Sequence, residues 1–241
     1  MPRAVEEARC VLSPGAHGFP LGAVFCHSPD HRIWEFTANG HRRLVTVLPT
    51  SDPTADDGAI AFDEVGRFGF ALLAATGRSG AGQPPGGAVF AIDSRGHARL
   101  LGHYTGSGGA DQLIVAPARF GSAPGEALLT VDDGATGGRL VAVAPDGSER
   151  TLMTFPDGPN PIVRLNSLAS GRLYLTDDER RYVYVAAAAP LRRYAGDVLI
   201  GSETRALFWV VRPNGAGFVA VPVGTNFHAS KHSLEAITLA P

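Results

Sequence analysis

The segment Ala91-Ile92-Asp93-Ser94-Arg95-Gly96 returns as Ala142-Val143-Ala144-Pro145-Asp146-Gly147, 51 residues further along the chain of 241 residues. In both copies an apolar run meets a polar turn that ends in glycine, and another run with apolar residues follows, at 98–104 and at 150–155. Tight hairpin turns need a positive φ, which glycine adopts without steric cost. The pattern therefore predicts a repeated β-hairpin.

Two further matches precede this hairpin. Arg67-Phe68-Gly69 returns as Arg119-Phe120-Gly121, and Ala71-Leu72-Leu73 returns as Ala127-Leu128-Leu129. Each unit is thus a strand, a loop with Phe-Gly, two strands, a tight turn and a last strand. Four antiparallel strands with a period of about 50 residues are typical of a propeller blade. A β-sandwich, the other all-β interpretation, accounts for the strand density but not for the repeated order.

The composition agrees with an all-β fold, because 30 glycines and 18 prolines disfavour long helices. We expect one β-propeller of about five four-stranded blades. Six is the alternative, because the 68 residues from Gly147 to Gly215 suit neither one blade nor two. The C-terminal strand is expected to complete the N-terminal blade and so close the ring. The predicted parts are an N-terminal extension at 1–20, blades at 22–50, 57–105, 109–156, 159–190 and 195–223, and a closing strand at 232–241.

The charge excludes some classes of protein. A net charge of −2 with 18% charged residues is not that of a basic nucleic-acid binder. No apolar run reaches the roughly 18 residues of a membrane span. The N-terminus lacks the apolar core of a signal peptide, so we expect a cytoplasmic protein. We also expect a monomer that acts on a small molecule. Cys10 and Cys26 are too few for a disulfide framework or a cysteine zinc site.

Four segments carry a resemblance to a known family. They are the expected inner-strand starts Gly109-Ala110-Asp111-Gln112-Leu113-Ile114-Val115, Gly158-Pro159-Asn160-Pro161-Ile162-Val163 and Ser233-Leu234-Glu235-Ala236-Ile237, with the second strand Gly171-Arg172-Leu173-Tyr174-Leu175-Thr176-Asp177. Together they resemble the gluconolactonase/regucalcin-like superfamily of calcium-dependent β-propellers and its NHL-repeat relatives, over nearly the whole chain past Gly22. That scaffold hosts lactonases, phosphotriesterases, lyases, condensing enzymes and plain binding proteins.

The resemblance implies a divalent ion, calcium or a similar cation, on the propeller axis, held by Glu235, Asn160 and Asp111. Oxygen ligands of this kind suit a hard cation. The implied function is a metal-dependent hydrolase of a small lactone or ester. Asp111 would also act as general base, and His232 as a proton carrier or substrate contact. Further candidates for substrate binding at strand ends are Asp57, Asp132, Asp177 and Glu203.

Other interpretations stay open. The same polar residues would serve equally as turn and strand caps. The protein would then be a non-hydrolytic lyase or cyclase of a small-molecule pathway that uses the central channel, or a non-catalytic ligand-binding propeller. His27 and His31 have a ligand-like spacing, but Pro29-Asp30 predicts a hairpin turn that points the two rings apart.

Overall fold

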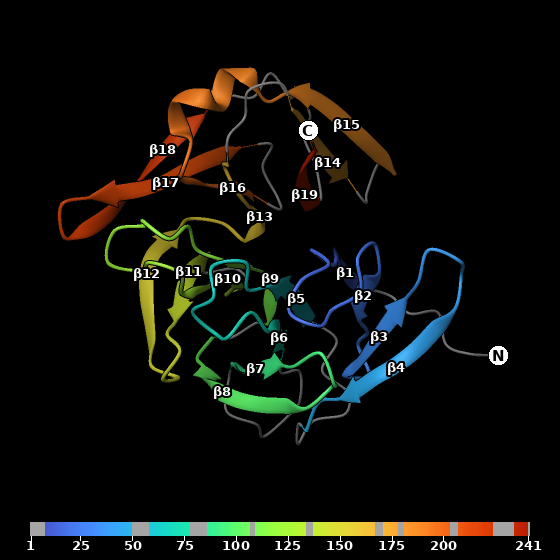
Figure 1. Ribbon diagram of the computed structural model, residues 1–241. Coiled ribbons are helices and arrows are strands. Elements are labelled where there is room, and N and C mark those ends of the chain that lie inside the picture. Colours follow the sequence, from blue (N-terminus) through green and yellow to red (C-terminus); the bar gives the residue numbers. More distant parts are fainter. Residues whose placement is uncertain are drawn as a thin grey trace.

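The computed structural model describes residues 8–49, 58–77, 86–106, 109–133, 137–166, 171–177, 181–202, 207–223 and 234–240. Its strands form five antiparallel sheets arranged as the blades of a propeller (Figure 1). The all-β class and the five blades are confirmed. Blade 1 contains β1 (Arg9–Leu12), β2 (Val24–His27), β3 (Arg32–Phe36) and β4 (Arg42–Val47); blade 2 contains β5 (Gly58–Phe62), β6 (Leu72–Thr76), β7 (Gly87–Ile92) and β8 (Ala98–Tyr104); blade 3 contains β9 (Ala110–Val115), β10 (Ala127–Asp132), β11 (Gly138–Val143) and β12 (Glu149–Phe155).

The last two blades are interleaved in the chain. Blade 4 contains β13 (Pro159–Arg164), β16 (Val198–Ser202), β17 (Phe208–Asn214) and β18 (Gly217–Val223). Between β13 and β16 the chain leaves blade 4 and forms β14 (Arg172–Asp177), β15 (Tyr182–Ala187) and the 3₁₀ helix η2 (Ala189–Tyr194). Blade 5 consists of β14 and β15 together with β19 (Leu234–Ala240). The predicted blades at 159–190 and 195–223 were therefore wrong, and the inserted hairpin explains the long spacing between Gly147 and Gly215.

The predicted ring closure was also wrong. Strand β19 pairs with β14 from Leu234 to Ala240 and completes blade 5, not the N-terminal blade. The N-terminal blade has its own inner strand, because Arg9–Leu12 pairs with Val24–His27. The edge of β2 is thus already occupied, whereas the edge of β14 is available to β19. The predicted N-terminal extension at 1–20 accordingly contains a strand.

The repeated hairpins are confirmed. They join β7 to β8 and β11 to β12, and their glycines Gly96 and Gly147 have φ values of 89° and 85°. In each turn the glycine N–H donates to a backbone carbonyl three residues earlier, at Asp93 and Ala144. The positive φ expected from the sequence is therefore what these turns use.

Apolar side chains fill four interfaces between consecutive blades. The loop between the first and second strand of each of the first three blades inserts one phenylalanine into these interfaces: Phe19, Phe68 and Phe120. The described residues form no such cluster between blade 5 and blade 1. Tyr182, Val183 and Val185 of blade 5 are exposed, as are Leu12, Phe36, Leu44 and Val47 of blade 1. Within the described part of the chain, the five blades thus share four apolar interfaces.

Blade 1 carries one covalent cross-link. Cys10 and Cys26 lie opposite each other on β1 and β2 and form a disulfide. Disulfides are typical of oxidising compartments, so this bond does not support the predicted cytoplasmic location. In the part of the chain that is described, no helix has the length and apolar character needed to cross a membrane.

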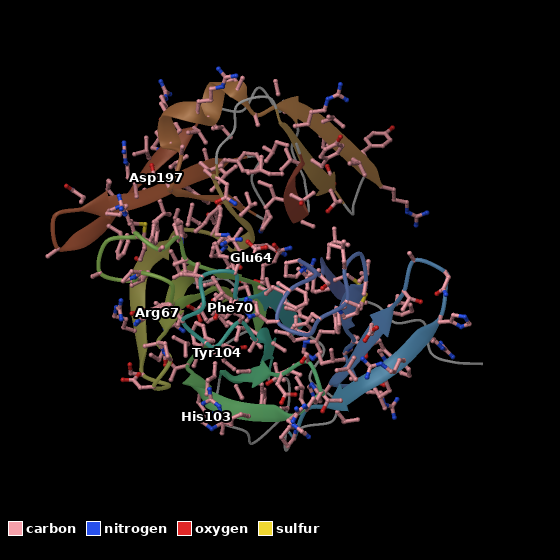
Figure 2. The ribbon with its side chains drawn as sticks, in the orientation of Figure 1. Glu64, Arg67, Phe70, His103, Tyr104 and Asp197 are labelled. Carbon is pink, nitrogen blue, oxygen red and sulfur yellow. A yellow bond between two sulfur atoms is a disulfide. The ribbon has the colours of Figure 1, made fainter. Side chains whose placement is uncertain are left out.

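A buried tyrosine connects blades 2 and 3. The Tyr104 hydroxyl donates to the Thr76 carbonyl at 2.7 Å and accepts the Ala110 N–H at 2.8 Å. Tyr104 is 1% exposed, and Figure 2 shows it within the body of the propeller. Both bonds satisfy backbone groups at strand ends, so the hydroxyl joins the ends of β6 and β8 to the start of β9.

Tyr104→Phe is expected to lower the free energy of unfolding by about 2 kcal/mol, because it leaves a buried carbonyl and a buried N–H without this partner. Denaturant unfolding followed by tryptophan fluorescence would measure the change. Tyr182→Phe, at an exposed tyrosine, is the matched control. Equal stabilities of the two variants would contradict this role for the Tyr104 hydroxyl.

Candidate functional site at the start of the inner strands

The innermost strand of each blade borders the propeller axis. These strands contact one another in the order β1, β5, β9, β13 and β19. Their starts are joined by hydrogen bonds: Tyr104 connects the end of β6, beside the start of β5, to Ala110, and Thr130 connects β9 to Asn160 of β13. This end of the ring therefore collects the polar residues with which the inner strands begin.

Three inner strands begin with a β-bulge. Asp111 in β9 lies between Ala110 and Gln112, which pair with consecutive residues of β10. Asn160 and Pro161 in β13 lie between Pro159, which pairs with Ser202, and Ile162, which pairs with Ile200. Glu235 in β19 lies between Leu234 and Ala236, which pair with consecutive residues of β14. Bulges are frequent beside active sites, where they redirect a side chain.

The bulges coincide with the three predicted ion-binding residues. Asp111, Asn160 and Glu235 are each the second residue of an inner strand, on the three consecutive blades 3, 4 and 5. Asp111 is half-buried and Asn160 is 2% exposed. The backbone of Glu235 is described, but its side chain lies outside the described residues. The pairing of β5 with β6 is regular over its described residues, Gly58 to Phe62.

The structure describes two of the other predicted site residues, Asp132 and Asp177. Asp132 and Asp177 are the last residues of the second strands of blades 3 and 5, and they pair with Gly138 and Leu234. Asp177 is 1% exposed and lies 3.4 Å from the Tyr184 hydroxyl, which donates to it. The same position of blade 4 is Ser202, whose hydroxyl donates to Asp157 at 2.7 Å. Asp57, Glu203 and His232 lie outside the described residues.

The opposite end of the ring is spanned by an ion pair. Arg164, the last residue of β13, donates to Glu64 in the loop that follows β5. Figure 2 shows Glu64 near the middle of the molecule, beside β13. This pair joins blades 2 and 4 at the end of the inner strands opposite the bulges.

The sequence did not predict that His27 and His31 are buried close together at the bulged end. His27 ends β2 and His31 precedes β3; they are 2% and 3% exposed, and their ring centroids are 6.3 Å apart. The prediction that the hairpin points the rings apart was wrong. His31 has a φ of 60°, so the turn bends away from an ordinary strand continuation. A Cβ at Gly58 would lie 2.5 Å from the His27 ring, so the absence of a side chain at Gly58 makes room for this imidazole.

Burial determines the ionisation of His27. Desolvation, with a smaller contribution from the nearby His31, lowers the pKa of His27 from 6.5 to about 4. The Ala59 backbone and Asp30 oppose this shift but do not cancel it. His27 is therefore neutral at pH 7.

The donor chemistry at the bulges fits a hard divalent cation. A carboxylate from Asp111, an amide oxygen from Asn160 and a carboxylate from Glu235 are the oxygen ligands that calcium prefers. Among the described side chains, no three His, Cys, Asp or Glu residues are grouped so as to hold a metal ion. That finding does not include the Asn160 amide or the Glu235 side chain.

Comparisons with known proteins add the fold and no activity. No protein-family model and no curated protein matches the chain. It is similar to a crystal structure of a protein from Lactobacillus plantarum, a structural-genomics target, with a TM-score of 0.52 and 10% sequence identity. The match covers 96% of this chain but 57% of that protein, so the chain spans little more than half of its length. At this identity the likeness shows the β-propeller fold alone.

Proposed function

We propose that the protein binds a divalent cation, calcium or a similar ion, at the bulged end of the axis and hydrolyses a small lactone or ester there. The observation that supports the proposal is the coincidence of Asp111, Asn160 and Glu235 with the three inner-strand bulges. Strand caps need no such coincidence, whereas a site that draws ligands from three blades needs their side chains redirected toward one point. The resemblance to gluconolactonase/regucalcin-like propellers favours the same three residues.

The residues present suit the hydrolysis of an ester bond. A bound divalent ion polarises a substrate carbonyl and lowers the pKa of a bound water. Asp111 would accept the proton of the water that attacks the carbonyl carbon. The bond between that carbon and the ester or lactone oxygen then breaks, and His232 would return a proton to the leaving oxygen. Asp132 and Asp177, with Asp57 and Glu203, would contact the hydroxyl groups of the substrate.

Elemental analysis and thermal melts test the ion site. We expect one divalent ion per chain and a melting temperature that EDTA lowers and calcium restores. Calcium at a hundredfold excess over its dissociation constant stabilises by about 2.7 kcal/mol. Glu235→Ala, Asn160→Ala and Asp111→Asn should each reduce the calcium-dependent shift. Asp146→Asn, at a carboxylate in the hairpin between β11 and β12, is the matched control, because that hairpin lies at the other end of blade 3.

The outcomes separate the candidate functions. A calcium-dependent melt together with hydrolysis in a lactone and ester screen supports the proposal. A bound ion with no hydrolysis of any substrate, but with a product formed without consumption of water, favours the lyase or cyclase. No ion and no effect of EDTA or calcium would overturn the proposal and favour a non-catalytic binding propeller.

A further inference from the structure

Thr130 lies between two of the three bulges. It is 0% exposed and belongs to β10 of blade 3, one strand away from the axis. Its hydroxyl donates to the backbone carbonyl of Asn160 at 2.7 Å, across the boundary between blades 3 and 4. The same oxygen accepts the backbone N–H of Gln112, the residue after Asp111, at 3.2 Å. One hydroxyl therefore contacts the backbone at both bulges.

Gln112 makes a second connection across the same boundary. Its side-chain oxygen accepts the backbone N–H of Ile162 at 3.3 Å. Thr130 thus binds the carbonyl at one end of the segment 160–162, and Gln112 binds the N–H at its other end. Two side chains of blade 3 therefore bind the backbone on both sides of the bulge in blade 4.

The bulge needs such support from outside its own sheet. As the innermost strand, β13 pairs within its sheet on one side only, with β16. Its pairing with β16 is interrupted at Asn160 and Pro161, and proline has no N–H to donate. The bonds from Thr130 and Gln112 therefore reach the backbone where the register within blade 4 is interrupted. The β-branched side chain of Thr130 has few rotamers, so its hydroxyl is a rigid partner.

We infer that Thr130 and Gln112 are positioning residues for the axial ion site. They hold the backbone at Asp111 and Asn160 in the bulged geometry that directs both side chains to one ion. The inference rests on the proposed function, since it concerns the same site. Residues that orient metal ligands typically change metal affinity 10- to 100-fold when they are replaced, because the ligands lose their fixed orientation.

Thr130→Val tests the inference, since valine keeps the shape and removes the hydroxyl. The matched control is Thr76→Val, because Thr76 is 2% exposed and its hydroxyl bonds to Ala88 within blade 2. Calcium affinity, measured by isothermal titration, should fall about tenfold in Thr130→Val and stay near that of the unmodified protein in Thr76→Val. Thr130→Ser, which restores the hydroxyl, should recover the affinity. Melting temperatures in EDTA report the stability of each variant separately from its affinity.

A second variant tests the inference in case Thr130→Val does not fold. Gln112→Met removes the acceptor for Ile162 at a half-buried position, and it should weaken calcium binding and accelerate hydrogen exchange of the Ile162 amide. If the unmodified protein binds calcium but Thr130→Val and Gln112→Met bind it equally well, the inference is wrong and the proposed function stands. If the unmodified protein binds no divalent ion, the proposed function and this inference both fail.

Discussion

Replacing both Cys10 and Cys26 with alanine is expected to lower the free energy of unfolding by roughly 3 kcal/mol. The two residues are separated by 16 positions, and a cross-link that closes a loop of this length removes about that much entropy from the unfolded chain. The bond matters locally as well, because β1 has only four residues and forms the inner strand of the N-terminal blade. Denaturant unfolding without reductant, compared with the unmodified protein, measures the difference.

Two controls accompany the cysteine pair. The unmodified protein unfolded in excess reductant should match the double variant, because reduction removes the same cross-link. A thiol assay on protein prepared without reductant should find no free thiol. Two free thiols per chain, and equal free energies of unfolding for the unmodified protein and the double variant, would contradict the disulfide. This result would favour the cytoplasmic location predicted from the sequence.

His27→Phe is expected to remove a loss of stability that the unmodified protein shows between about pH 6.5 and pH 4. The folded protein holds the pKa of His27 at about 4, whereas the unfolded chain has the ordinary value of 6.5. Between these values the unfolded state binds more protons, so stability falls as the pH falls. The difference in pKa corresponds to a contribution of roughly 3 kcal/mol to the free energy of unfolding. This contribution is fully present above pH 6.5 and is lost as the pH falls to about 4.

The measurement is the free energy of unfolding as a function of pH for both proteins. Phenylalanine keeps an aromatic ring against Gly58 and carries no titrating group, and His27→Leu serves as a second variant. The control is His103→Gln, because Figure 2 labels His103 on β8, where the side chain is exposed. A His27→Phe curve parallel to that of the unmodified protein from pH 7 to pH 4 would show that His27 does not contribute this pH dependence.

The repeat in the sequence predicted the blades where the chain follows one order. Blades 2 and 3 are continuous, and their hairpin glycines, Gly96 and Gly147, need a positive φ that the residue type itself reveals. The prediction failed where strand partners are distant in the chain. The pairing of β13 with β16 and of β14 with β19 depends on which strand edges are available, and local composition carries no record of this.

The candidate site shows the same division. Asp111, Asn160 and Glu235 could be selected from the sequence, because the segments that contain them resemble the inner-strand starts of a known propeller family. The buried pair of His27 and His31 could not, since the turn conformation at His31 and the room above Gly58 bring the rings together. The contacts of Thr130 with Gln112 and Asn160 were equally hidden, because 30 residues separate Thr130 from Asn160.

By itself, then, the sequence determined an all-β propeller of about five blades, with six left as the alternative, and the polar residues that begin its inner strands. These properties follow from turn chemistry, which acts over a few residues, and from an order of strands and turns that repeats after about 50 residues. Only the tertiary structure decided which strand completes which blade, that Cys10 and Cys26 are bonded, and that bulges occur at Asp111, Asn160 and Glu235. Each of these depends on two segments that meet only after folding, and the energy of such a contact is absent from either segment alone.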